Sequence, residues 1–295
     1  MIKTVNKLYG ILDLLIPELM CRTQLQRKPE PDLLMEREEN VKFFHNQGKM
    51  DGPLIPIYHF NALATSRLVP LNGTVLDLGS GSGQYLVYLA NLRKDITIIG
   101  LELSEEMIKI GNAAIEAAGL DDRITLSIGD MTSFNSLIPS NVDVISSIFA
   151  FHHLPSIQYL KKCLNELSAA HHQYNCSIWA FDHVRPKLKR TAVNFPEVFT
   201  PKSPEKFKRD STNSLIASFS FAELSSYLDH LFGKKVFHSC SRLMKLYQVH
   251  LIESDKIMDN KISKISSASL SGITLKDYQM FRWMFGSVPI DRDPL

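Results

Sequence analysis

Apolar residues recur at helical spacing across positions 1–20 of the chain. Leu8, Leu12, Leu15 and Leu19 lie three or four positions apart and form one face of a helix. Charged residues and a proline interrupt the stretch, which therefore lacks the roughly 20 consecutive apolar residues that a membrane-spanning helix needs. We expect an amphipathic helix that docks on the rest of the chain, with binding to a membrane surface as the alternative.

From Thr74 onward the pattern changes to short apolar runs that alternate with helical periodicity. Runs expected to form strands occupy residues 74–78, 97–101, 124–128, 142–148 and 177–181. Strands that alternate with helices at this spacing predict a doubly wound α/β fold with a parallel sheet.

The pattern becomes less regular after the fifth predicted strand. Residues 183–210 hold four prolines and eight basic residues against three acidic ones, so we expect a basic loop. Ser220 and Glu223 form a capping-box signature for a helix that reaches Leu231. Two further strands, 234–238 and 244–251, are expected to close the sheet as an antiparallel pair.

The C-terminal region divides into two parts. Residues 253–272 are polar and rich in Ser and Lys, which is typical of a linker. Residues 275–285 are too apolar to remain in solvent, and we expect them to dock. The predicted organisation is a helical cap (1–70), an α/β domain (71–252), and a linker with a C-terminal extension (253–295).

The charge balance and the cysteine content argue against several classes of function. The 295 residues include 33 basic and 31 acidic side chains, a balance that argues against a dedicated nucleic-acid-binding protein. Four scattered cysteines form no Cys-x-x-Cys pair, so neither a zinc ribbon nor a redox motif is expected. Free thiols favour a reducing compartment, and we expect a cytoplasmic protein.

A glycine-rich turn follows the first predicted strand. Asp77 lies near the end of the strand, and Gly79, Gly81 and Gly83 precede the next helix. Glycines allow positive φ and close approach of a ligand, and a strand–turn–helix context favours a nucleoside-containing cofactor. A dinucleotide fingerprint would place a glycine where Gln84 stands, and a carboxylate at position 77 suits a cationic amino-acid group better than a pyrophosphate. A turn without a ligand is the alternative.

The pattern Asp-x-Gly-x-Gly-x-Gly resembles that of the class I S-adenosylmethionine-dependent methyltransferases. Glu102 stands at the end of the second strand, and Asp130 and Met131 follow the third. The resemblance implies that Glu102 binds the ribose hydroxyls, that Asp130 binds the adenine amine and that Met131 lies against the ring. A solvated Glu102 and an ordinary turn acid at Asp130 are the alternatives. The cofactor-binding residues implied are Asp77, Gly79, Ser80, Gly81, Gly83, Glu102, Leu103, Asp130, Met131 and Ile148.

The resemblance extends over about positions 25 to 252 and is firmest from 74 to 186. The chain is similar to a bacterial subgroup of small-molecule-type enzymes, which implies a mostly parallel seven-stranded sheet. We expect helices from segment 1–70 and a loop at 183–215 to cover the cofactor. On this basis 71–252 is an S-adenosylmethionine-binding methyltransferase domain.

Three residues are candidates for catalysis. His152 and His153 follow the fourth strand in a loop that borders the methyl group in this family, and Asp182 ends the fifth strand. Each histidine contacts the acceptor, or it caps the helix that begins at Pro155 or holds the loop. Asp182 serves the site, or it pairs with Arg185 or anchors a loop. The histidine pairs lack the i, i+4 spacing of a zinc helix, so no metal site is predicted.

The predicted function is methyl transfer from S-adenosylmethionine to an O, N or S atom of a small molecule. Asn-Pro-Pro-Tyr and Pro-Cys motifs are absent at the fourth strand, which argues against a nucleic-acid base methylase. The alternatives are a tRNA or protein methyltransferase that uses the basic residues of 185–209 and a non-catalytic module that binds the cofactor. No transmembrane segment is expected, and the sequence leaves the oligomeric state open.

Overall fold

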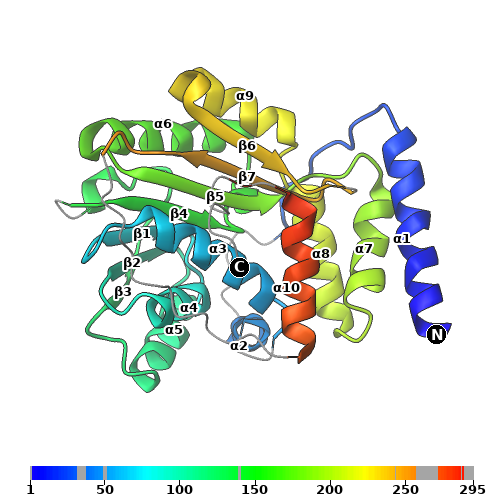
Figure 1. Cartoon of the computed structure of the whole chain (residues 1–295), viewed down its shortest axis with the longest axis horizontal. Helices are drawn as coiled ribbons and strands as arrows, with labels where there is room; N and C mark the ends of the chain where they lie inside the picture. Colours follow the sequence, from blue (N-terminus) through cyan, green and yellow to red (C-terminus); the bar gives the residue numbers. More distant parts are fainter. Residues whose placement is uncertain are drawn as a thin grey trace.

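The computed structural model describes residues 2–31, 38–48, 52–138, 141–242, 244–256, 272–286 and 288. Its centre is a seven-stranded sheet in the order β3-β2-β1-β4-β5-β7-β6 (Figure 1). The first five strands are parallel, whereas β7 runs antiparallel to both β5 and β6. The strands are β1 (Thr74–Leu78), β2 (Thr97–Glu102), β3 (Ile124–Ile128), β4 (Val144–Ile148), β5 (Ser177–His183), β6 (Val236–Cys240) and β7 (Tyr247–Ile252).

The predicted doubly wound fold is confirmed, and every predicted strand is present. Helices cover both faces of the sheet because successive strand residues point to opposite sides. Val75 contributes to the core on one face and Leu76 to the core on the other. The first face carries α3 (Ile55–Leu68), α4 (Gln84–Leu92) and α5 (Glu105–Ala117), and the second carries α6 (Ile157–Tyr174) and α9 (Phe221–Phe232).

The strand order reverses between β1 and β4. From β1 the chain continues outward through β2 and β3, and from β4 it continues the other way to β5. At such a switch point the loops after the strands diverge, and open α/β sheets bind their ligands in the crevice that results.

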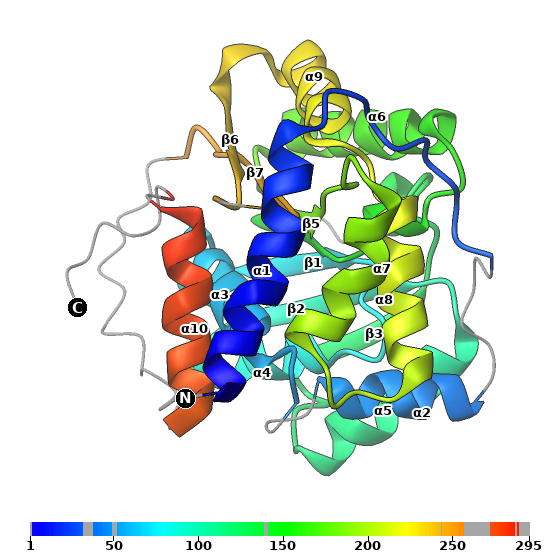
Figure 2. The same ribbon diagram turned by 90° about the vertical axis from the view of Figure 1, so that its right-hand side faces the viewer.

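A group of helices lies beyond the carboxyl ends of the parallel strands. Figure 2 shows α1 (Ile2–Met20), α7 (Lys189–Phe199) and α8 (Glu205–Ala217) side by side, with α2 (Glu38–Gln47) below α8. We call α1, α7 and α8 the cap. By contrast, α3 packs on α4 against the sheet, so segment 1–70 supplies both a cap helix and part of the sheet layer.

The prediction of a loop across 183–215 is wrong, because much of this segment forms α7 and α8. The prolines are compatible with helix because tertiary contacts satisfy the carbonyl groups that they leave free. Pro196 lies inside α7, and the carbonyl of Ala192, four positions earlier, accepts a 3.3 Å hydrogen bond from Thr212 Oγ1 of α8. The cap is therefore a small packed unit rather than an irregular loop.

The first helix docks as expected, but with a different face. Leu14 is buried between α1 and the other cap helices, and the Glu18 carboxylate is also buried, where it accepts a hydrogen bond from Thr191 Oγ1. Leu12 and Leu19, on the predicted face, are exposed, whereas Leu15 of that face is partly buried against the core of the cap. The buried face is offset from the predicted one because it includes a charged residue. Among the described residues, no helix is both long and apolar enough to cross a membrane.

The apolar C-terminal stretch forms α10 (Gly272–Phe285), which packs on α3, as its composition predicted. Phe281 and Phe285 are 5% and 4% exposed, and their rings lie 5.4 and 5.1 Å from the ring of Phe60. Most of the predicted linker, 257–271, lies outside the described residues.

We predict that Phe285→Ala lowers the free energy of unfolding by about 3–5 kcal/mol, because the change removes a buried aromatic ring and leaves a cavity. Leu275→Ala on the same helix is the control, since Leu275 is 39% exposed and its truncation should cost far less. Urea denaturation of both variants measures the difference. Equal stability of the two variants would show that α10 does not stabilise the core.

Candidate active site

A cavity of about 1350 Å³ opens at the carboxyl edge of the sheet. Its floor is formed by the loops that follow the parallel strands, and its walls include residues of α1, α7, α8 and α10. Ligand pockets commonly measure about 300–1,000 Å³, so this cavity has room for more than one small molecule.

The glycine-rich turn borders the cavity. Gly79, Gly81 and Gly83 all have positive φ, and a Cβ atom on Gly79 would lie 2.5 Å from the Cβ of Ala150. The backbone amides of Gly79 and Ser80 donate to the carbonyl of Leu101, which fixes the turn against β2. The turn therefore needs glycine both for its dihedral angles and for its close contact with the loop after β4.

Asp77 lies beneath this turn. It lines the cavity, is 2% exposed and accepts a 2.6 Å hydrogen bond from Ser146 Oγ of β4. Burial raises the pKa of Asp77 to about 8, against the effect of the Ser146 hydrogen bond and with a further contribution from the charge of Glu102. A cationic ligand group would favour the ionised carboxylate, which agrees with the cationic group expected at this position.

Glu102 organises two turns at once. Its Oε2 accepts a hydrogen bond from the amide of Gly81 at 2.8 Å, and its Oε1 accepts from the amides of Leu103 and Ser104 at 2.9 and 3.0 Å. The alternative of a merely solvated side chain is therefore wrong. Oε2, which accepts only one of these hydrogen bonds, can still accept a further one from a ligand hydroxyl.

The predicted cofactor-binding residues do not all face the cavity. Met131 lies on its wall, within 3.1 Å of where a Cβ on Gly79 would stand. Asp130 Oδ1 accepts a 2.7 Å hydrogen bond from the amide of Thr132, which matches an ordinary turn acid. The cavity lining includes Asp77, Gly79, Ser80, Gly81, Glu102, Leu103, Met131 and Ile148, but not Gly83 or Asp130.

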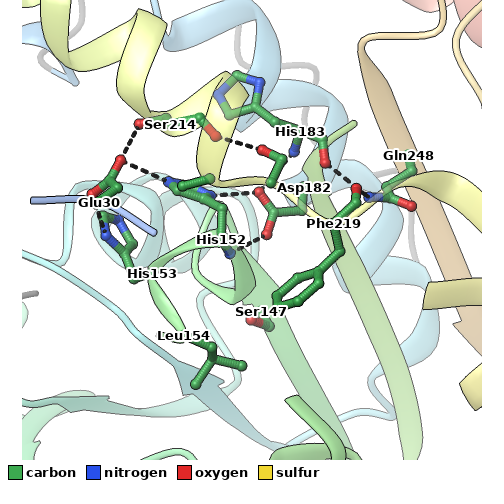
Figure 3. Close-up of polar contacts among 12 residues, drawn as sticks. Glu30, Ser147, His152, His153, Leu154, Asp182, His183, Ser214, Phe219 and Gln248 are labelled. Atoms are coloured by element: carbon green, nitrogen blue, oxygen red, sulfur yellow. Dashed lines mark hydrogen bonds and ion pairs between the residues drawn. The ribbon is translucent and has the colours of Figure 1, made fainter. Parts of the chain in front are cut away.

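The candidate catalytic residues His152 and Asp182 lie together (Figure 3). Asp182, near the end of β5, accepts hydrogen bonds from the backbone amides of His152 at 2.9 Å and of His183 at 2.7 Å. It also contacts His152 Nδ1 at 2.6 Å. Burial alone would raise the pKa of Asp182, but the two histidines hold it below its ordinary value. Asp182 does not pair with Arg185, whose guanidinium binds Glu223 instead.

Glu30 lies beside His152 and His153, although no sequence pattern identified it as a site residue. Its Oε2 lies 2.8 Å from His153 Nδ1, and its Oε1 accepts a 2.6 Å hydrogen bond from Ser214 Oγ of α8. His152 Nε2 is 4.0 Å from the same Oε1 (Figure 3). Burial of Glu30 is outweighed by His153, which lowers the pKa of the carboxylate to about 2. Both predicted histidines thus face a carboxylate that comes from a distant segment.

That segment, residues 21–31, runs in an extended conformation across the loop after β4, and we call it the strap. Arg27 fixes its position, because the guanidinium donates to the carbonyls of His152, Leu154 and Pro155 and lies 4.1 Å from the centre of the Phe219 ring. The same side chain also donates to the carbonyl of Ala217 at the end of α8. Arg27 therefore fixes the strap against both the loop after β4 and the end of α8.

His183 is a second residue that the sequence did not select, although it directly follows Asp182. Its ring lines the cavity and stacks on Phe149 with 4.5 Å between ring centres. Its Nδ1 atom is buried and has no hydrogen-bond partner in the described part of the chain. Burial lowers the pKa of His183 to about 3, so the ring is neutral. Phe149 has a φ of 57°, a strained value for a bulky residue and one that often marks a functional site.

Residues 75–174 match the family model described as a methyltransferase domain. The matched region contains the glycine-rich turn, Glu102 and the two candidate histidines, which border the cavity. Residues 75–174 therefore form a methyltransferase domain.

Curated relatives match shorter stretches of this chain. A carboxy-S-adenosyl-L-methionine synthase of Campylobacter jejuni is 38% identical over 56 residues, which span 19% of this chain and 24% of that protein. An uncharacterised methyltransferase of Bacillus cytotoxicus is 37% identical over 82 residues, or 28% of this chain and 34% of that protein. The chain thus spans about a quarter to a third of the length of these relatives.

Solved structures share the fold at low identity. A methyltransferase from Aquifex aeolicus is 20% identical, with a TM-score of 0.51 over 74% of this chain and all of that chain. The plantazolicin methyltransferase BpumL, solved with S-adenosylhomocysteine, is 14% identical, with a TM-score of 0.53 over 86% of this chain and all of that chain. At these identities the structures establish the methyltransferase fold alone.

We predict that the protein releases a proton when it binds S-adenosylmethionine or its demethylated product near pH 7. The raised pKa of Asp77 means that the carboxyl is largely protonated in the free protein, and a bound ammonium group would favour its ionised form. Calorimetric titration with S-adenosylhomocysteine in buffers of different ionisation enthalpy measures the proton count, which should vanish in Asp77→Asn. Equal proton release by both proteins would contradict the assignment.

The raised pKa of Asp77 also predicts how the stability of the protein depends on pH in the absence of cofactor. Because folding raises the pKa of Asp77 from 3.8 to about 8, the stabilisation from this carboxyl is complete below about pH 4 and declines as the pH rises to about 8. The free energy of unfolding should therefore fall between pH 5 and 8 more steeply in the wild type than in Asp77→Asn. Parallel slopes in denaturation experiments would contradict the raised pKa.

Proposed function

We propose that the protein transfers a methyl group from S-adenosylmethionine to an O, N or S atom of a small, largely apolar acceptor. One observation carries the proposal: a single cavity joins the glycine-rich turn and Glu102 to the cluster of Glu30, His152 and His153. A cofactor at the first position and an acceptor at the second would share one enclosed space.

The cofactor end offers a partner for each part of S-adenosylmethionine. The Asp77 carboxyl is suited to the ammonium group, and the free acceptor capacity of Glu102 is suited to the ribose hydroxyls. Met131 on the cavity wall is suited to a face of the adenine ring. Asp130 would contact the adenine amine only if its turn rearranged, because its carboxylate now accepts from Thr132.

The acceptor end is aromatic and apolar. Its walls come from the cap, from the segment before β7 and from α10, and the apolar members include Phe195, Phe199, Phe207, Met244, Tyr247 and Phe281. Such walls favour an acceptor with a substantial apolar or aromatic body and a small polar group that enters the cluster. The neutral ring of His183 also lines the cavity and adds to its apolar, aromatic walls.

Methyl transfer requires little of the protein beyond alignment of the acceptor atom with the methyl group. A lone pair of the acceptor atom attacks the methyl carbon as the carbon–sulfur bond breaks, and the electron pair of that bond stays on sulfur to give S-adenosylhomocysteine. Good alignment of two bound reactants is worth about 7–11 kcal/mol of the barrier. The cap would exclude water from the transfer site.

The contacts of the basic residues in 185–209 argue against the alternative of an RNA or protein acceptor held by them. Four of those eight side chains are engaged within the chain: Arg185 with Glu223, Lys187 with the carbonyl of Cys21, Arg190 with Asp13, and Lys208 with Glu197 and Glu205. The segment therefore serves mainly to assemble the cap, which favours a small acceptor.

We predict that Glu102→Ala weakens S-adenosylhomocysteine binding by about 1–3 kcal/mol, the usual cost of losing hydrogen bonds to a charged group. Glu105→Gln on the adjacent helix is the matched control, because its side chain is exposed. Isothermal titration calorimetry of both variants measures the effect. Unchanged affinity in Glu102→Ala would remove Glu102 from the cofactor site.

For the acceptor end, His152→Ala should lower turnover by about a hundredfold while S-adenosylhomocysteine affinity stays nearly constant, because small misplacements of a reacting group are costly. His172→Ala, which changes an exposed histidine on α6, is the control. Turnover is measured as S-adenosylhomocysteine release in a screen of apolar alcohols, phenols, amines and thiols. A lower melting temperature with normal turnover would assign His152 a purely structural role.

A further inference from the structure

Glu30, His152 and His153 bring three metal-ligating groups to one place. One carboxylate oxygen and one ring nitrogen from each histidine all lie within 4.8 Å of one another. Donor atoms around an ion with bonds of about 2.0–2.2 Å are spaced by roughly 3–3.5 Å. A modest inward movement of these side chains would reach that spacing.

The surroundings of His152 are those of a metal ligand. Asp182 Oδ1 lies 2.6 Å from His152 Nδ1, so the proton belongs on Nδ1 and the lone pair of Nε2 points toward Glu30. The distance from Nε2 to Glu30 Oε1 is 4.0 Å, too long for a direct hydrogen bond but suitable for a bridging atom. Metal-binding histidines usually carry such a carboxylate on their other nitrogen.

The charge of the cluster also favours a cation. Glu30 and Asp182 are two shielded carboxylates on either side of His152, with side chains 12% and 4% exposed. When the histidines are neutral, as ligands must be, the cluster carries two negative charges, only partly offset by the Arg27 guanidinium of the strap.

We infer that Glu30, His152 and His153 bind one divalent transition-metal ion of the zinc type at the acceptor end of the cavity. Two imidazoles and one carboxylate suit Zn²⁺, Co²⁺, Fe²⁺ or Ni²⁺ better than Mg²⁺ or Ca²⁺, which prefer oxygen ligands. Three protein ligands leave coordination positions for an acceptor, as in catalytic rather than structural metal sites.

The role of the ion rests on the proposed function. An acceptor hydroxyl bound to the ion would lose its proton at a lower pH, and the half-exposed His153 side of the site gives that proton a route to water. The resulting oxyanion attacks the methyl carbon of S-adenosylmethionine, and the bonding pair leaves with sulfur. The products are a methyl ether, S-adenosylhomocysteine and one proton, so atoms and charge balance.

The test is a Co²⁺ titration of the full chain after metal removal with a chelator, followed by visible absorption and calorimetry. We expect one Co²⁺ per chain, displaced by Zn²⁺. Affinity should fall at least tenfold in Glu30→Gln and in His153→Ala, and about ten- to a hundredfold in Asp182→Asn, which removes the charge of the carboxylate behind His152. His172→Ala should bind like the wild type. Thermal melting of each variant verifies that it is folded.

Two results would overturn the metal site. One is a wild-type protein that binds neither Co²⁺ nor Zn²⁺ with a dissociation constant below about 100 μM, a weak affinity for a specific site. The other is binding that persists unchanged in Glu30→Gln and His153→Ala. S-adenosylhomocysteine titrations on the same samples separate this inference from the proposed function. Absence of metal binding with intact cofactor binding contradicts the metal site alone, and metal binding without cofactor binding contradicts methyl transfer alone.

Discussion

The buried carboxylate of Asp182 fixes the loop that carries His152 and His153. It accepts hydrogen bonds from the backbone amides of His152 and His183 and pairs with the His152 ring, so it joins the loop after β4 to the end of β5. Because Asp182 is buried, loss of these partners would leave an uncompensated charge, and the loop has little freedom to choose another conformation. The orientation of His152, and through it the position of Glu30, follows from this contact.

Segments far apart in the chain meet at that loop. The strap reaches it through Arg27, which donates to three of its carbonyl groups, and α8 reaches the strap through the hydrogen bond from Ser214 to Glu30. The proposed acceptor end thus combines the strap, the loop after β4 and the cap, whereas the proposed cofactor end is built by the loops that follow β1 to β3.

Sequence patterns predicted the sheet and the glycine-rich turn because both depend on neighbouring residues: alternation within short strands, and glycines that need positive φ. They did not predict α7 and α8, whose prolines suggested a loop, because the freed carbonyl of Ala192 is satisfied by Thr212 from another helix. Glu30 was also missed, since it lies far from His152 along the chain and no local spacing connects them. Residues that act through tertiary contacts leave no periodic signal.

The most direct test of this account is a crystal structure of the protein with S-adenosylhomocysteine. The account predicts the amino group of the ligand beside Asp77, its ribose hydroxyls on Glu102, and its sulfur directed along the cavity toward Glu30, His152 and His153. A ligand bound outside the cavity, or one whose sulfur faces away from that cluster, would contradict it.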